Sequence, residues 1–293
     1  MRTAAFEEKE YEAPLYNQLE RGCPNVWSPG QVFEGQIGID RALLVSSPRF
    51  WRLLGRMNPA GVFMNRYDWN YMWRRHAPRP LPNFRLNLFV QAKRPSYFKR
   101  APLHIRHVGL TNPGWCFKVD SDQQTALEAV ARRLGLRAAV VYASPAFHTV
   151  RQLYAHTKRG TIIDHSTFPD IVNLSGHSRW YYDSAGGSGV ANPNPSFFEG
   201  QSLYHAIERL LRDQSSASDT NASRELLILS KEITSALDES RLENNPRVAF
   251  FFEELRTIDD ELRHFEAIGE EVRSFYHISA FTEFFNVEWF TLA

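Results

Sequence analysis

Residues 84–95, FRLNLFVQAKRP, constrain the fold more than any other stretch of the chain. Apolar side chains occupy every second position from Phe84 to Ala92. A period of two predicts a β-strand with one face in a hydrophobic core. Gln91 and Lys93 stand two residues apart at the end of this strand, so their side chains should project from the same face of the sheet.

This pair of side chains has a definite chemical use. The amide oxygen of Gln91 can contact a hard cation, and the ammonium group of Lys93 can hold or activate a water molecule. Metal-assisted cleavage of a phosphodiester requires both. The end of this strand is therefore the first candidate for a catalytic site.

Composition sets broader limits. With 293 residues, the chain is long enough for one large domain, or for one domain with a smaller one appended. Its two cysteines, Cys23 and Cys116, argue against a disulfide scaffold and favour a reducing cytoplasm. No apolar run approaches the length of a membrane span, and the N-terminus lacks a signal-peptide pattern. We therefore expect a cytoplasmic protein that does not engage a membrane.

The charges are distributed unevenly along the chain. Residues 69–119 contain no Asp or Glu but ten Lys and Arg residues, whereas residues 224–288 are acidic on balance. A basic stretch that includes the candidate strand favours a polyanionic partner such as nucleic acid. The alternative is a set of solvated loops whose charges pair with the acidic segment.

Periodicity and turn residues predict the order of elements. The expected helices cover residues 6–20, 123–134, 145–156, 196–212 and 223–241, with a longer one from about residue 246. Asp122 is the expected N-cap of the second helix, and Gly135 should end it. The expected strands lie within 25–45, at 84–95, 136–143 and 161–163, and within 171–183, and residues 96–114 are expected to be a basic loop.

The same analysis divides the chain into parts. Residues 46–82 are rich in aromatic and arginine residues and read as an insertion within a first domain of residues 1–212. Residues 213–223 are polar and form the expected linker. Residues 224–293 should form a helical C-terminal region, whose apolar stripe suits a core or a self-association face.

Three short motifs, taken in order, resemble the PD-(D/E)XK nuclease superfamily and look closest to its Mrr-type restriction-endonuclease branch. They are Tyr11-Glu12 in the first helix, Gly38-Ile39-Asp40 on the second strand and Gln91-Ala92-Lys93-Arg94 on the third. The resemblance implies an α/β fold in which helices flank a mixed central sheet, as in restriction endonucleases. An all-helical C-terminal part would be added to it.

The resemblance also implies a role for each matching residue. Asp40 would be the central metal-binding carboxylate, and Glu12 would complete the metal shell from the first helix. Gln91 would contribute its side-chain carbonyl and Ala92 its backbone carbonyl. Lys93 would position the attacking water or stabilise charge on the phosphate. With oxygen ligands throughout, the metal would be magnesium, with manganese as a substitute.

The activity so implied is that of a magnesium-dependent endonuclease. DNA is favoured over RNA as the substrate, and the resemblance suggests a bacterial antiviral or restriction-type effector. The C-terminal helices could serve a homodimer or a protein partner. The residues expected to bind nucleic acid are Arg74, Arg75, Arg94, Lys99 and Arg100.

Several alternatives stay open at this point. Asp40 could form a salt bridge with Lys93 or Arg94 and bind no metal. Glu8 or Glu20 could replace Glu12, and Gln123 or Gln124 could stand near the site. The whole chain could be a catalytically degenerate module that binds nucleic acid or a protein, or a structural subunit assembled through its C-terminal helices.

Overall fold

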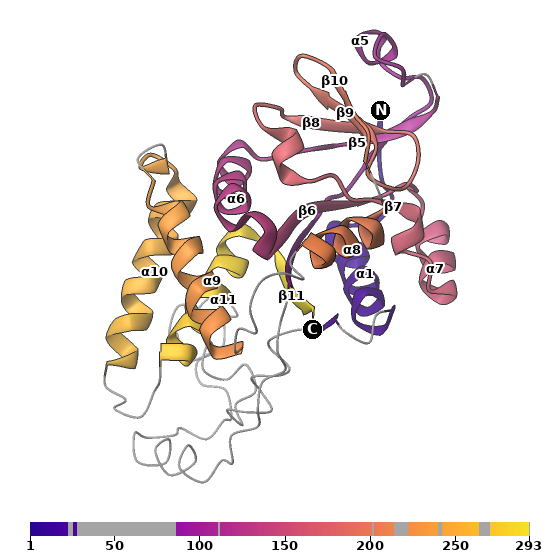
Figure 1. Ribbon diagram of the computed structural model, residues 1–293. Helices are drawn as coiled ribbons and strands as arrows, with labels where there is room; N and C mark the ends of the chain where they lie inside the picture. Colours follow the sequence, from indigo (N-terminus) through magenta and orange to yellow (C-terminus); the bar gives the residue numbers. More distant parts are fainter. Residues whose placement is uncertain are drawn as a thin grey trace, which may run out of the picture.

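The computed structural model describes residues 1–22, 26–27, 86–110, 112–200, 202–213, 222–239, 242–263 and 270–292. The chain is mixed α/β, with a central sheet, a second sheet and helices on both sides of the central sheet (Figure 1). Asp40, Arg74, Arg75 and the expected insertion at 46–82 lie outside the described residues. Residues 214–221 of the expected linker lie outside them too.

The described strands of the central sheet run in the order β2-β11-β3-β6-β7. Strand β3 is parallel to β6, with Gln91 opposite Tyr142, and antiparallel to β11, with Val90 opposite Glu288. The sheet is therefore mixed, as expected. The bounds of its strands are Val26–Trp27 (β2), Leu86–Ala92 (β3), Ala138–Pro145 (β6), Ser166–Thr167 (β7) and Glu288–Leu292 (β11).

Strand β3 confirms the strand expected at residues 84–95, but both of its faces are buried. Leu86, Leu88, Val90 and Ala92 belong to one hydrophobic cluster, whereas Phe89 belongs to another. The alternation separates two cores instead of a core from solvent. Strands covered on both faces are typical of sheets with parallel crossovers, because helices then lie on each side.

Helices cover the two faces of the central sheet in separate groups (Figure 1). One face is covered by α1 (Glu8–Gly22), α7 (Val150–Arg159) and α8 (Leu203–Asp213). The opposite face is covered by α6 (Ser121–Leu134), α9 (Ala222–Leu237), α10 (Pro246–Leu262) and α11 (Glu270–Phe285). Helix α1 is continuous through Pro14 and ends at Gly22, close to the predicted helix.

The second sheet corrects the expectation of a basic loop at 96–114. Its described strands run antiparallel in the order β1-β4-β5-β8-β9-β10. One face packs Phe117, Trp180 and Tyr182 against the layer that contains α6. The outer face packs Cys116 and Tyr181 with the short helix α5 (Leu103–Arg106). The strand bounds are Arg2–Thr3 (β1), Ser96–Phe98 (β4), Gly114–Lys118 (β5), Arg179–Tyr182 (β8), Gly189–Asn192 (β9) and Ser196–Phe198 (β10).

The prediction of an all-helical C-terminal part is wrong at its end. The chain is helical to Phe285 and then enters the central sheet as β11. Trp289 joins the cluster with α6 and α9–α11, whereas Phe290 joins the cluster with α1. The indole nitrogen of Trp289 also donates to Asn87 Oδ1 of β3 at 3.0 Å. Residues on both sides of the expected linker thus share one hydrophobic core, and the domain division stays a prediction.

Several helices and strands begin at residues other than those predicted, because capping side chains outside the periodic stretch fix where they start. Asp120, and not Asp122, caps α6, since its side chain accepts a hydrogen bond from the Gln123 N–H at 2.9 Å. Helix α7 starts only at Val150, where Thr149 and Gln152 form a capping box. The strand expected at 161–163 is not formed there, because Ile163–His165 is a 3-10 turn and the strand β7 follows it.

Two predicted helices each correspond to two elements in the structure. The helix expected at 196–212 is β10 followed by α8, and the long helix expected from residue 246 is α10 followed by α11. Among the described residues, none of the helices combines the length and the apolar character needed to cross a membrane.

Candidate active site at the end of strand β3

The ammonium group of Lys93 stands just past the end of β3, between the sheet and α6. Its Nζ donates to Gln123 Oε1 at 3.1 Å and lies 5.3 Å from the centre of the Tyr142 ring. Tyr142 belongs to the core on the α6 side, which is also the side of Phe89. Because strand side chains alternate, Gln91 projects to that side as well. The geometry agrees with the expected common face.

The surroundings of Lys93 change its acidity. Burial is the main cause and lowers the pKa of its ammonium group from 10.5 to about 8. The carboxylates of Glu8 and Asp120 act in the opposite direction, and the Arg247 guanidinium adds to the lowering. A lysine with this pKa is charged at neutral pH but gives up its proton far more easily than a surface lysine.

Gln91 carries a second unusual feature. Its side chain is 2% exposed, and its Oε1 is buried without a hydrogen-bond partner among the described residues. A buried amide oxygen normally accepts a hydrogen bond, because leaving it unpaired costs about 1–3 kcal/mol. The oxygen is thus available to a cation or to a water molecule at the same end of β3.

Two acids of α1 approach this end of the strand from the sheet face opposite to that of Gln91 and Lys93. Glu8 and Glu12 are one helical turn apart and lie on the same side of α1. Glu8 Oε2 accepts a hydrogen bond from the Arg94 backbone N–H at 3.2 Å. Burial raises the pKa of Glu8, and the nearby charge of Lys93 opposes that rise. Glu12 is 7% exposed and forms a 2.7 Å ion pair with Lys9. Glu8 therefore suits the expected role of the acid from the first helix better than the predicted Glu12.

Tyr16 of α1 contacts the backbone of Ala92. The Tyr16 side chain is hydrogen-bonded to the Ala92 backbone, and burial raises the pKa of its hydroxyl. Strand β11 begins opposite Val90, so Ala92 lies past the start of that ladder. A polar cavity of about 280 Å³ opens beside Glu12 and Tyr16, and its lining also includes Glu283, Asn286 and Glu288.

Residues at the start of α6 line the side of the site opposite to α1. Gln123 Oε1 accepts from Lys93, while its Nε2 donates to the backbone oxygen of Phe285 at the end of α11. Asp120 lies 3.7 Å from the Arg247 guanidinium of α10. Sequence reasoning raised Gln123 as an alternative but missed Asp120 and Arg247. Asp120 could have been found as an N-cap, whereas nothing local marks Arg247.

Among the described residues, no group of three or more His, Cys, Asp or Glu side chains is arranged to hold a metal ion. Asp40, the expected central ligand, lies outside these residues. Comparisons with protein-family models, curated proteins and solved structures found no match for this chain.

The predicted nucleic-acid-binding residues differ in their exposure and in their contacts within the fold. Arg94 is engaged at the N-terminal segment, since it donates to Glu7 Oε2 and to the Ala4 backbone oxygen, both at 2.7 Å. Lys99 and Arg100 are exposed directly after β4. In the described structure, Lys99 and Arg100 are therefore accessible to a ligand, whereas the Arg94 side chain is held by contacts with the N-terminal segment.

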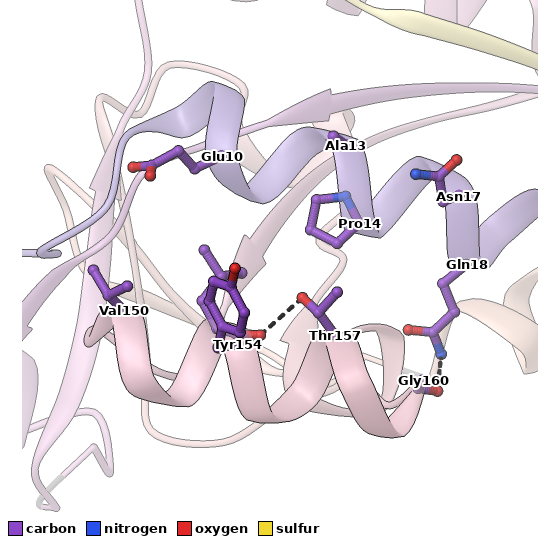
Figure 2. A pocket seen from close by; sticks show the side chains of 10 residues that line it. Glu10, Ala13, Pro14, Asn17, Gln18, Val150, Tyr154, Thr157 and Gly160 are labelled. Carbon is purple, nitrogen blue, oxygen red and sulfur yellow. Dashed lines mark hydrogen bonds between the residues drawn. The ribbon is translucent and has the colours of Figure 1, made fainter.

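A larger groove, of about 760 Å³, lies away from this site, between α1 and α7 (Figure 2). Ala13, Pro14 and Leu153 contribute to its lining, and Glu10 and Gln18 lie at its edges. Among its described lining residues, Glu10 supplies the only ionisable carboxylate and no lysine or arginine takes part. This groove lacks the charged groups that phosphodiester chemistry requires.

Proposed function

We propose that the chain is a metal-dependent nuclease of the restriction-endonuclease-like fold that hydrolyses phosphodiester bonds, with DNA as its substrate. The observation that supports this most directly is Lys93, whose pKa is about 8, two residues along the chain from Gln91, whose carbonyl oxygen has no hydrogen-bond partner among the described residues. The parallel β3–β6 pair, with α6 in the connection between them and helices on both faces, supports the fold.

Lys93 suits two tasks in such a reaction. At neutral pH its ammonium group can stabilise the negative charge that develops on the phosphate. Near pH 8 a substantial fraction is neutral and can accept a proton from the attacking water, because catalytic groups act best when their pKa lies near the working pH. Gln123 holds the side chain in place for either task.

The chemistry of the proposed donors suits a hard divalent cation such as Mg²⁺, or Mn²⁺ in its place. All are oxygens, and Gln91 Oε1 lacks any other partner in the described structure. We propose that Asp40, Gln91, the Ala92 backbone carbonyl and Glu8, with Glu12 nearby, would hold it. When bound, such an ion supplies charge stabilisation and a more acidic water.

A second candidate function is a catalytically degenerate module that binds nucleic acid or a protein partner. It is favoured by the amide at position 91, where a carboxylate would hold a cation more strongly, and by the ion pair that occupies Glu12. In this case Lys93 would contribute charge for binding without taking part in hydrolysis.

The experiment incubates the full chain with plasmid DNA and with RNA, in Mg²⁺, in Mn²⁺ and in EDTA. Asp40→Ala and Lys93→Ala are expected to abolish cutting, and Lys158→Ala, at an exposed lysine of α7 outside the proposed binding residues, is the matched control. Undiminished cutting by Lys93→Ala would reject this site. Binding without turnover in either metal would favour the degenerate module.

A further inference from the structure

The outer face of the second sheet carries two cations directly opposite each other. Lys118 of β5 pairs in register with Arg179 of β8, and Arg179 pairs in turn with Asn192 of β9. Cys116 and Tyr181, two residues away on the same strands, belong to the outer cluster with α5. Side chains two apart share a face, so Lys118, Arg179 and Asn192 form a row across the outer face.

These two cations have no acidic partner among the described residues. The described ion pairs include neither Lys118 nor Arg179. Asp120 is close in sequence, but it accepts from the Gln123 N–H and lies against Arg247. Like charges opposite each other on neighbouring strands destabilise a sheet. An anion bound across the two strands would remove that cost.

An exposed aromatic ring stands on the same face. Phe197 of β10 is 49% exposed and pairs in register with Val190 of β9, which pairs with Tyr181 of β8. Its side chain therefore lies one row away from the row of Lys118 and Arg179. An exposed aromatic ring near unpaired cations is the combination that holds an unpaired base and the phosphates beside it.

The row of cations begins close in sequence to a residue of the candidate active site. Lys118 precedes Asp120 by two residues, and the charge of Asp120 acts on Lys93. Figure 1 shows β5, β8, β9 and β10 beside one another, on the side of β6 from which α6 starts. A ligand that crosses Lys118 and Arg179 could therefore continue toward Lys93.

We propose that this face binds a single strand of nucleic acid, with phosphates on Lys118 and Arg179 and a base stacked on Phe197. The direction of the strand toward Lys93 rests on the proposed nuclease function, but the binding itself does not. Single-stranded nucleic acid is favoured over a duplex because the bases of a duplex are paired and cannot stack on Phe197.

The test measures fluorescence anisotropy of a labelled single strand of about 20 nucleotides, longer than the usual site of one single-strand-binding domain, and of the matching duplex. The full chain is used in EDTA, so cutting cannot interfere. Lys118→Gln with Arg179→Gln should weaken single-strand binding about tenfold or more at low salt. The slope of log affinity against log salt should fall by about 1.4, since each neutralised phosphate contact contributes about 0.7.

Phe197→Ala should weaken single-strand binding about fivefold or more and leave duplex binding unchanged. The matched control is Lys158→Gln with Arg159→Gln, which removes two exposed cations from α7 and should leave affinity nearly unchanged. Equal weakening by both double variants, or an unchanged affinity in Lys118→Gln/Arg179→Gln, would overturn the proposal. Equal loss of duplex binding in Phe197→Ala would overturn the single-strand assignment.

The nuclease function and the binding face can be rejected independently of each other. A wild-type chain that binds the strand in EDTA but never cuts in Mg²⁺ rejects the nuclease and keeps the binding face. A chain that cuts, with the same KM in Lys118→Gln/Arg179→Gln, rejects the binding face and keeps the nuclease.

Discussion

Replacing Lys93 with methionine should remove catalytic activity and, at the same time, stabilise the fold at neutral pH. Burial lowers the pKa of Lys93 from 10.5 to about 8, so the folded chain holds the charged form at a cost. Methionine has a similar length and carries no charge. A residue kept at the expense of stability is typical of a functional site.

The size of the effect follows from the two pKa values. Each unit of pKa difference corresponds to about 1.36 kcal/mol, so a fall from 10.5 to about 8 lowers the free energy of unfolding by about 3 kcal/mol at neutral pH. Loss of the hydrogen bond with Gln123 offsets about 1 kcal/mol of the gain. The net gain expected for Lys93→Met is therefore about 2 kcal/mol.

The pH dependence is a more specific signature than the absolute value. The unfolded chain keeps the Lys93 proton up to about pH 10.5, whereas the folded chain releases it near pH 8. Between these values the unfolded state binds more protons, so the stability of the wild type rises with pH. From pH 7.5 to 9.5 this rise amounts to about 2 kcal/mol, and Lys93→Met should lack it. Below about pH 8 the full cost is present.

The assay is urea unfolding of wild type, Lys93→Met and the exposed control Lys99→Met at pH 7.5, 8.5 and 9.5, followed by fluorescence or circular dichroism. Groups that titrate in all three chains, such as Cys116, cancel in the differences. Parallel stability profiles for wild type and Lys93→Met would refute the reasoning, because Lys93 would then titrate as it does in the unfolded chain.

Three further predictions concern other parts of the structure. Gln91→Leu should leave the free energy of unfolding unchanged or raise it by about 1 kcal/mol, because it removes a buried oxygen without a described partner, while metal-dependent cutting is lost; a clear fall in urea stability would contradict this. Phe290→Ala should cost about 3–5 kcal/mol, since this ring is fully buried against α1, and Phe250→Ala, at a ring that is 59% exposed, should change little; equal thermal shifts for the two would contradict the placement of β11. Gly114→Ala should lower the melting temperature strongly, because a Cβ there would overlap the Tyr182 carbonyl oxygen and the Phe98 ring; an unchanged melting temperature would show that β5 and β8 do not approach so closely.

Local patterns in the sequence predicted the elements whose signal is contained in one stretch. The alternation at 84–95 predicted β3, and the apolar stripe ended by Gly135 predicted α6. The same alternation placed Gln91 and Lys93 on one face. Within the second sheet, β8 lies in the stretch where a strand was expected, 171–183. Strands such as β4 and β10 escaped prediction because they are three residues long, too short to display a period.

The chain by itself therefore determined that a strand ends in an amide and a lysine, since spacing along a strand decides which side chains share a face. Only the tertiary structure decided what meets them there. Glu8, Asp120, Gln123 and Arg247 approach Lys93 from three different helices and their caps, and β11 pairs with β3 from about two hundred residues away. The lowered pKa of Lys93 comes mainly from burial by these distant segments, and no local pattern encodes burial of that kind.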